Sequence, residues 1–109
     1  MNLRQLQAKK ISKEKNESVY GKIVLITGRL PQYTRTTIER KIRELGGNVV
    51  DMATVHTNIV VYTRIDTSKY IQARRLSMSS APHIVFVKGD DFITNYLKLE
   101  SGDEDEPED

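Results

Sequence analysis

The feature that most constrains the fold is an uninterrupted apolar run, Ile23-Val24-Leu25-Ile26, that closes on Thr27-Gly28. A run that is mostly β-branched and lacks polar alternation is typical of a strand buried on both faces, as in a parallel sheet. Glycine interrupts such a strand, and residues 29–34, with Pro31 among them, are predicted to form a loop. The chain is therefore expected to fold around a central strand that is covered by helices.

A basic helix is predicted directly after this loop, over residues 35–45. Thr34 is a suitable N-cap, and the apolar residues of the helix recur at the i, i+4 and i+7 spacing of a face that packs on a sheet: Ile38, Ile42 and Leu45. Gly46-Gly47 ends the helix, because glycine adopts the left-handed conformation after a last turn at little cost.

The remaining elements complete a β-α-β-β-α-β-α order. They are short strands over residues 48–51 and 58–62, a helix over about 68–77, a buried strand over 84–87 and a last helix opened by residues 89–91. The inward face of the middle helix is predicted to be Ile71, Ala73 and Leu76. Strands that alternate with helices and form apolar runs predict an α/β fold, here a four-stranded parallel sheet flanked by helices.

Charge divides the chain into three predicted segments. Residues 1–22 hold six Lys or Arg against two acidic residues, whereas residues 100–109 hold seven acidic residues and no basic one. We expect a basic arm over 1–18, either helical or frayed, one folded domain over 19–99 and a disordered acidic tail over 100–109. The folded segment is also basic, and local positive patches attract nucleic acids.

Several classes of protein are excluded by what the sequence lacks. Without cysteine there is no disulfide scaffold, thiolate nucleophile or Cys-based zinc site, and His56 and His83 stand singly, so no metal site is expected. No apolar run is long enough to cross a bilayer, and no signal peptide is recognisable. No nucleophile triad or phosphate loop is present, so we expect neither enzyme activity nor a cofactor.

The absence of a membrane or signal segment favours an intracellular protein, and the Met1 start and the acidic end favour a natural short protein of bacterial or phage origin. We expect it in the cytoplasm, associated with the nucleoid. A eukaryotic protein of this kind would be nuclear.

Thr27-Gly28 is also a candidate anion site. The carboxyl end of a central strand is where open α/β sheets place ligands, and glycine lets backbone N–H groups approach an anion closely. The Thr27 hydroxyl can donate one further bond, and Arg35 begins a helix whose N-terminus carries partial positive charge. The alternative is that Thr27 only bonds the backbone and Gly28 only turns the chain, as in many α/β proteins without a ligand.

Over about residues 20–97 the chain resembles BRCT domains. The resemblance rests on Thr27-Gly28, on Arg35, on Gly46-Gly47 and on Ser68-Lys69 at the start of the second helix. It is similar to the single BRCT domains of bacterial NAD-dependent DNA ligases and of the replication factor C large subunit, which share these positions. Phe92 stands where many BRCT domains carry a Trp, and the ligase-like branch likewise uses a smaller apolar residue.

The resemblance implies a non-catalytic module that binds double-stranded DNA and recognises a 5′-phosphorylated end in replication, repair or ligation. The implied phosphate site is Thr27, Gly28, Arg35 and Lys69. Two cations suit a terminal phosphate, which carries about −1.5 to −2 charges, better than an internal diester with one. Contacts with the DNA backbone are expected from further basic residues, unless these only form a solvated face: Lys9, Lys10, Lys13, Arg29 and Arg74.

The expected protein partners are a ligase, a clamp loader or another replication or repair protein. The alternative function is a protein-interaction adaptor that binds a phosphopeptide or a partner domain, since BRCT domains also serve as adaptors.

Overall fold

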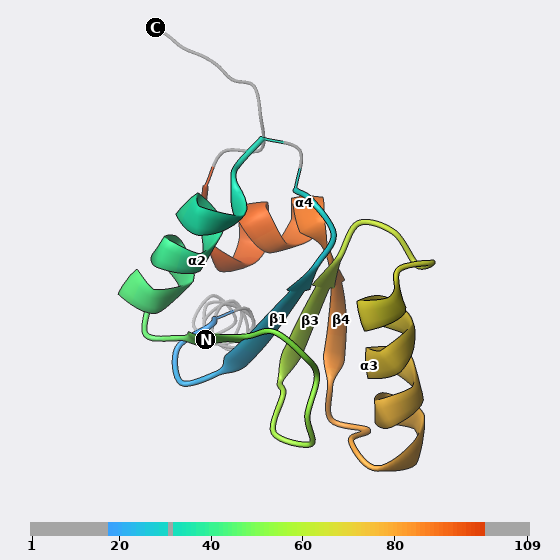
Figure 1. Ribbon diagram of the computed structural model, residues 1–109. Coiled ribbons are helices and arrows are strands. Elements are labelled where there is room, and N and C mark those ends of the chain that lie inside the picture. The colour runs from blue at the N-terminus through green and yellow to red at the C-terminus, as the bar shows by residue number, and fades with distance from the viewer. Residues whose placement is uncertain (1–17, 31, 100–109) are drawn as a thin grey trace, which may run out of the picture.

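The computed structural model describes residues 18–30 and 32–99, which form a parallel sheet with helices on both faces (Figure 1). The predicted acidic tail and nearly all of the predicted basic arm lie outside these residues. The strands are β1 (Ile23–Thr27), β2 (Asn48–Val50), β3 (Ile59–Tyr62) and β4 (Val85–Lys88), in the spatial order β2-β1-β3-β4. The predicted four-stranded parallel sheet is confirmed.

Helix α2 (Arg35–Glu44) and the last helix cover one face of the sheet, and α3 (Ser68–Ser79) covers the other (Figure 1). The last helix consists of α4 (Gly89–Asp91) and a π-helical turn, η1 (Phe92–Tyr96). The predicted order of elements, β-α-β-β-α-β-α, is therefore observed. Within the described residues, no helix is long and apolar enough to cross a membrane.

β1 is buried on both faces, as its apolar run predicts. Val24 and Ile26 pack into the core cluster that includes α2 and the last helix, whereas Leu25 points the other way, into the cluster beneath α3. β1 pairs in parallel with β2 on one side and with β3 on the other. A strand with neighbours on both edges and helices on both faces needs apolar side chains at every position.

α2 begins and ends as the sequence predicts. The Thr34 hydroxyl caps the helix by accepting the N–H of Thr37 at 3.2 Å, and Ile38 and Ile42 are fully buried against the sheet. After the last turn Gly46 has a φ of +91°, and a Cβ at this position would come within 2.5 Å of the Tyr20 ring. A side chain is therefore excluded there by the backbone conformation and by the neighbouring ring.

The predicted inward face of α3 is partly wrong. Ala73 is buried, but Ile71 is 39 % exposed, and Tyr70 occupies the interior instead. The Tyr70 ring packs against Tyr62 and Phe86, with ring centroids 5.1 and 5.6 Å away. A tyrosine can be buried in this way when its hydroxyl has a partner, which sequence periodicity does not reveal.

The prediction of a buried fourth strand is also wrong in part. β4 is an edge strand with β3 as its one neighbour, and Val85 is 49 % exposed. Val87 is buried and faces the cluster beneath α2. An apolar run marks a strand but does not say whether the strand lies at the centre or the edge of its sheet.

The last helix opens at Gly89, as predicted, and its apolar residues close the core. Phe92 is fully buried and stacks on Tyr96 with ring centroids 5.3 Å apart. The wider π turn forms where the N–H of Leu97 donates to the carbonyl of Phe92.

Candidate phosphate site

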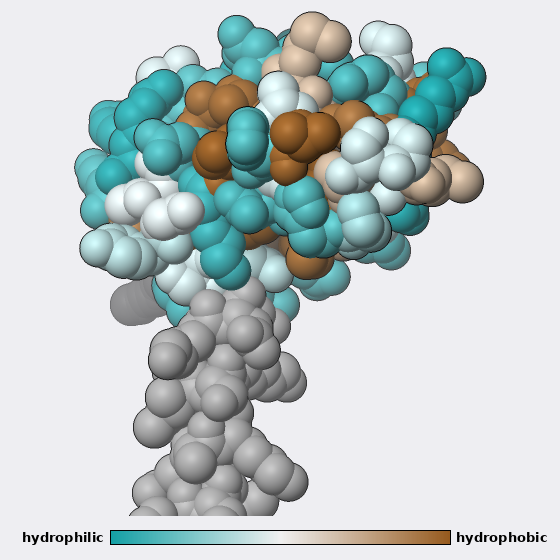
Figure 2. Space-filling model, turned by 90° about the horizontal axis from the view of Figure 1, so that it is seen from below, coloured by the Kyte–Doolittle hydropathy of each residue, from teal (hydrophilic) through white to brown (hydrophobic). Residues whose placement is uncertain are grey.

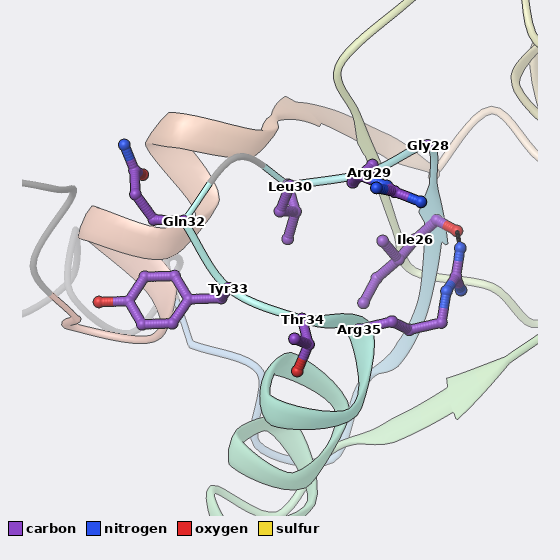
Figure 3. Close-up of a pocket in the computed structure, with 8 residues that line it drawn as sticks. All are labelled: Ile26, Gly28, Arg29, Leu30, Gln32, Tyr33, Thr34 and Arg35. Atoms are coloured by element: carbon purple, nitrogen blue, oxygen red, sulfur yellow. Dashed lines mark hydrogen bonds between the residues drawn. The ribbon is translucent and has the colours of Figure 1, made fainter.

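A pocket of about 650 Å³ opens where β1 ends and the loop leads into α2 (Figure 3). It lies at the carboxyl edge of the sheet, the edge at which open α/β sheets hold ligands. Among the described residues, two arginines and no carboxylate line it; the lining residues are Ile26, Gly28, Arg29, Leu30, Gln32, Tyr33, Thr34 and Arg35. The pocket is therefore positively charged, with apolar side chains in its interior.

Gly28 turns the chain out of β1 with a φ of +86°, a conformation that disfavours any residue with a Cβ. A Cβ here would lie 2.6 Å from the hydroxyl oxygen of Thr63, which follows β3. The ends of β1 and β3 thus come close together at this glycine, and the backbone at Gly28 remains accessible from the pocket.

Thr27 is buried, and its hydroxyl donates to the carbonyl of Val61 at 3.1 Å. Its side chain bonds the backbone of the neighbouring strand, which is the alternative considered from the sequence. A contact between this hydroxyl and a phosphate remains a prediction. It requires the hydroxyl to give up its hydrogen bond to the Val61 carbonyl and to donate to the phosphate instead.

Arg35 is held against the end of β1. One terminal nitrogen donates to the carbonyl of Ile26 at 3.3 Å (Figure 3). The other lies 3.8 Å from a carboxylate oxygen of Glu39. The Arg35 side chain is 43 % exposed, so water screens its ion pair with Glu39, and the pair holds the guanidinium only weakly. A guanidinium has five N–H donors, which leaves donors for a ligand in the pocket.

The N-terminus of α2 adds to the positive potential of the pocket. The Thr34 hydroxyl satisfies the N–H of Thr37, but the first backbone N–H groups of a helix have no acceptor within it. No acidic residue lies in the first turn, so the partial positive charge of the helix end is uncompensated there.

Lys69 does not line this pocket. It lies in the first turn of α3, partly buried, and α3 starts at the same edge of the sheet but covers the opposite face from α2 (Figure 1). The structure therefore brings Gly28, Arg29 and Arg35 together and leaves Lys69 to one side. Its role in phosphate binding stays a prediction.

The residues predicted to contact the DNA backbone differ in position. Arg29 lines the pocket, whereas Arg74 lies on α3, where its Nε donates to the Tyr70 hydroxyl at 3.0 Å and its guanidinium stacks 4.1 Å from the Phe86 ring. Arg74 thus supports the protein's own aromatic cluster. Three further residues lie outside the described part of the chain: Lys9, Lys10 and Lys13.

Sequence reasoning missed the contribution of Leu30 and Gln32 to the pocket, and no motif marks either residue. The glycine at position 89 is an indirect sign that Leu30 packs closely against the start of the last helix, because a Cβ there would lie 2.4 Å from a methyl group of Leu30. The glycine that opens the last helix thus lets the loop wall pack closely.

An ion pair in the loop between β3 and α3 was also missed. Arg64 donates to both carboxylate oxygens of Asp66, at 2.9 and 2.6 Å. The hydrogen bonds from Arg64 lower the pKa of the Asp66 carboxyl. In the described part of the chain, no cluster of His, Asp and Glu could hold a metal ion.

Comparison with known proteins identifies the family. Residues 15–99 match the BRCA1 C Terminus (BRCT) domain. The chain belongs to the BRCT family. This confirms the resemblance seen in Thr27-Gly28 and Gly46-Gly47.

The relatives found are bacterial proteins named DNA ligase. Those of Chlorobium phaeobacteroides and Protochlamydia amoebophila are each 38 % identical, over 73 and 72 residues, covering 67 % and 66 % of this chain and 11 % of each ligase. That of Clostridium perfringens is 37 % identical over 68 residues, 62 % of this chain and 10 % of the ligase. The chain thus spans about a tenth of these relatives. No solved structure matches it significantly.

Proposed function

We propose that this BRCT domain is a non-catalytic module that binds DNA and recognises a 5′-phosphorylated end. The observation that carries the proposal is the pocket at the end of β1, which is lined by Gly28, Arg29 and Arg35 and by no carboxylate from residues 18–30 or 32–99. A terminal phosphate presents three oxygens and more negative charge than an internal diester, so it gains most from two guanidinium groups and a helix N-terminus.

The remaining predicted residues complete the site in this proposal. Lys69 supplies a cation from the second helix that starts at the same edge of the sheet, and the basic arm lies along the duplex. Thr27 holds the end of β1 in place through its bond to Val61 and donates to the phosphate once that bond is exchanged.

The relatives support a place in DNA metabolism. The chain aligns with about a tenth of the length of proteins named DNA ligase. In this proposal it acts beside a ligase, clamp loader or other replication or repair protein, in the cytoplasm of a bacterium, near the nucleoid.

The decisive experiment compares the full chain's affinity for one duplex carrying either a 5′-phosphate or a 5′-hydroxyl at the same end. We expect tighter binding of the phosphorylated duplex, and an affinity that falls steeply with salt because phosphate contacts release counterions. Fluorescence anisotropy with a label at the opposite end measures both. Equal affinities for the two duplexes at every salt concentration would contradict the proposal.

The variant Arg35→Gln tests whether the pocket is responsible. Loss of a charge-assisted bond of about 1.5–3 kcal/mol should weaken binding of the phosphorylated duplex roughly 10- to 100-fold, with little effect on the hydroxyl duplex. Arg43→Gln is the matched control, because Arg43 lies on the same helix, also pairs with Glu39 and lies outside the pocket. If both variants behave alike, the effect is one of net charge and not of the pocket.

A phosphoserine peptide added to the same assay distinguishes the adaptor alternative. Because the pocket recognises a terminal phosphate together with a duplex in this proposal, the peptide should compete poorly. Displacement of the duplex by micromolar peptide would favour the adaptor.

A further inference from the structure

The outer surface of α3 differs from that of α2 in carrying large apolar side chains. Ile71 and Met78 lie one above the other on α3, 39 % and 83 % exposed. Met52 and Val55, also exposed, lie in the loop that joins β2 to β3, and this loop is tied to α3 where the Gln72 amide donates to the carbonyl of Ala53 at 3.3 Å. We call these four apolar residues the α3 face: Met52, Val55, Ile71 and Met78.

Figure 2 shows the molecule from below, at the amino ends of the strands, where apolar side chains gather on the surface. The loop between β2 and β3 runs along that end (Figure 1). The phosphate pocket lies at the opposite end of the strands, and α3 covers the opposite face of the sheet from α2. A molecule bound to the α3 face would therefore leave the pocket open.

A groove of about 460 Å³ runs along the same side of α3. It is lined by Ser68, Ile71, Gln72, Arg75, Leu76 and Ser79. The side-chain oxygen of Gln72 is buried with no hydrogen-bond partner, the one such side-chain atom found in the described residues.

The charge around the α3 face is mostly positive. Residues 51–58 and 67–88 contain one acidic residue, Asp51, against four basic residues: Lys69, Arg74, Arg75 and Lys88. The outer side of α2, in contrast, carries both signs and pairs Glu39 with two arginines. An occupant of the α3 face must therefore bring its own negative charge.

We propose that the α3 face binds an acidic amphipathic helix of a partner protein, whose apolar side chains pack between Ile71, Met78 and the β2–β3 loop. A helix laid into a groove offers apolar anchors at i, i+3, i+4 and i+7, which suits a groove that follows α3. This interaction does not depend on the phosphate site.

The chain's own segments and other molecules fit this surface less well. The segment before residue 18 is basic, and residues 100–109 are acidic but contain no apolar side chain. A second copy would place Arg75 against mostly like charges. A DNA backbone gains nothing from four exposed apolar side chains.

The test uses the full chain and three synthetic helical peptides of about 18 residues. The first has Leu at the four anchor spacings and Glu on the other face, the second replaces each Glu by Lys, and the third replaces each Leu by Ala. We expect the first to bind and the other two to bind at least about tenfold more weakly. In ¹H–¹⁵N NMR titrations the shifts should map to Ile71, Arg75 and Met78 and to the side-chain amide of Gln72.

Ile71→Ser and Met78→Ser should each weaken binding of the first peptide roughly tenfold. Ile65→Ser is the matched control, because Ile65 is 66 % exposed but lies in the loop before α3, outside the α3 face, and this variant should bind as the unaltered protein does. Circular dichroism checks that all three variants fold.

The proposal is overturned if the three peptides bind equally, or if the shifts map elsewhere. It is also overturned if the protein without peptide forms dimers that Ile71→Ser abolishes, because a second copy then covers the α3 face. Finally, a 5′-phosphorylated duplex that displaces the first peptide would assign the surface to DNA, whereas an unchanged peptide affinity supports two separate surfaces.

Discussion

The helices α2 and α3 start in similar ways at the same edge of the sheet, and yet only one start borders the charged pocket. Each is capped by a threonine, Thr34 or Thr67, has a cation in its first turn and has no acidic residue there. The preceding loops differ. The loop before α2 leaves β1 through Gly28 with a positive φ, and no carboxylate of the described part of the chain lines its pocket. The loop before α3 instead neutralises its own arginine, Arg64, through Asp66.

A helix N-terminus with a nearby cation is therefore insufficient to define an anion site. What distinguishes the α2 end is a backbone that turns without a side chain and an arginine, Arg35, whose ion pair with Glu39 at 3.8 Å is longer than the Arg64–Asp66 pair at 2.6 Å. The same pair of helices differs on the outer surface as well, where α2 is polar and α3 carries Ile71 and Met78.

Replacing Gly28 should give the largest effect. Gly28→Ala forces a Cβ into a left-handed conformation, which costs about 1–2 kcal/mol of the free energy of unfolding, and places it 2.6 Å from the Thr63 hydroxyl oxygen. We expect this variant to lose its preference for a 5′-phosphorylated duplex. Urea denaturation followed by circular dichroism and the anisotropy assay measure the two effects.

Gly21→Ala is its control. Gly21 also has a positive φ, +71°, but a Cβ there would meet nothing within 4 Å. It should lose similar stability and keep the preference for the phosphorylated end. If Gly21→Ala also loses that preference, general destabilisation and not the pocket explains the result.

Lys69→Gln tests whether the start of α3 contributes to the site after all. If the lysine reaches the phosphate, the phosphorylated duplex should bind about tenfold more weakly, as expected for one charge-assisted bond. Arg75→Gln removes the same charge two turns further along α3 and should have a much smaller effect. Equal losses of affinity in the two variants would show that Lys69 makes no specific contact with the phosphate, so that the residues at the start of α2 form the site alone.

The two helix caps should have equal effects on stability and unequal effects on binding. Thr34→Ala and Thr67→Ala each remove a hydroxyl that accepts a backbone N–H, which costs about 1 kcal/mol of the free energy of unfolding. Thr34 lines the pocket, so only its variant should also weaken binding of the phosphorylated duplex. Thermal unfolding and anisotropy measure the two quantities, and a similar loss of DNA binding in Thr67→Ala would contradict the comparison.

The sequence predicts most of the fold because its signals are local. The apolar run of β1, the Thr34 cap and Gly46-Gly47 each depend on the backbone within a few residues, and each has the predicted conformation. Errors arose where the outcome depends on distant neighbours. Tyr70 displaces Ile71 from the interior because the rings of Tyr62 and Phe86 are there to receive it, and nothing close in sequence indicates this.

The same distinction applies to the site. Gly28 and Arg35 are seven residues apart, joined by one loop, and the sequence places them together correctly. Lys69 comes from another element, and its distance from the pocket depends on how α3 packs on the other face of the sheet. The bond from Thr27 to Val61 likewise depends on the pairing of β1 with β3.

Breaking the Arg64–Asp66 ion pair before α3 should give the smallest effect on DNA binding. This change tests whether the ion pair accounts for the difference between the starts of α2 and α3. Asp66→Asn releases Arg64 from its partner, so the loop gains a free cation close to the ends of β1 and β3, and the phosphorylated duplex should bind about twofold more tightly at low salt. Asp51→Asn makes the same change in charge in the turn after β2 and should have less effect. Acid should reproduce the release only below the pH at which an aspartate ordinarily gains its proton, because Arg64 lowers the pKa of Asp66 and the pair is lost as the pH falls through that lowered value. An Asp66→Asn protein that binds both duplexes as before would show that the difference between the helix starts lies in Gly28 and its loop.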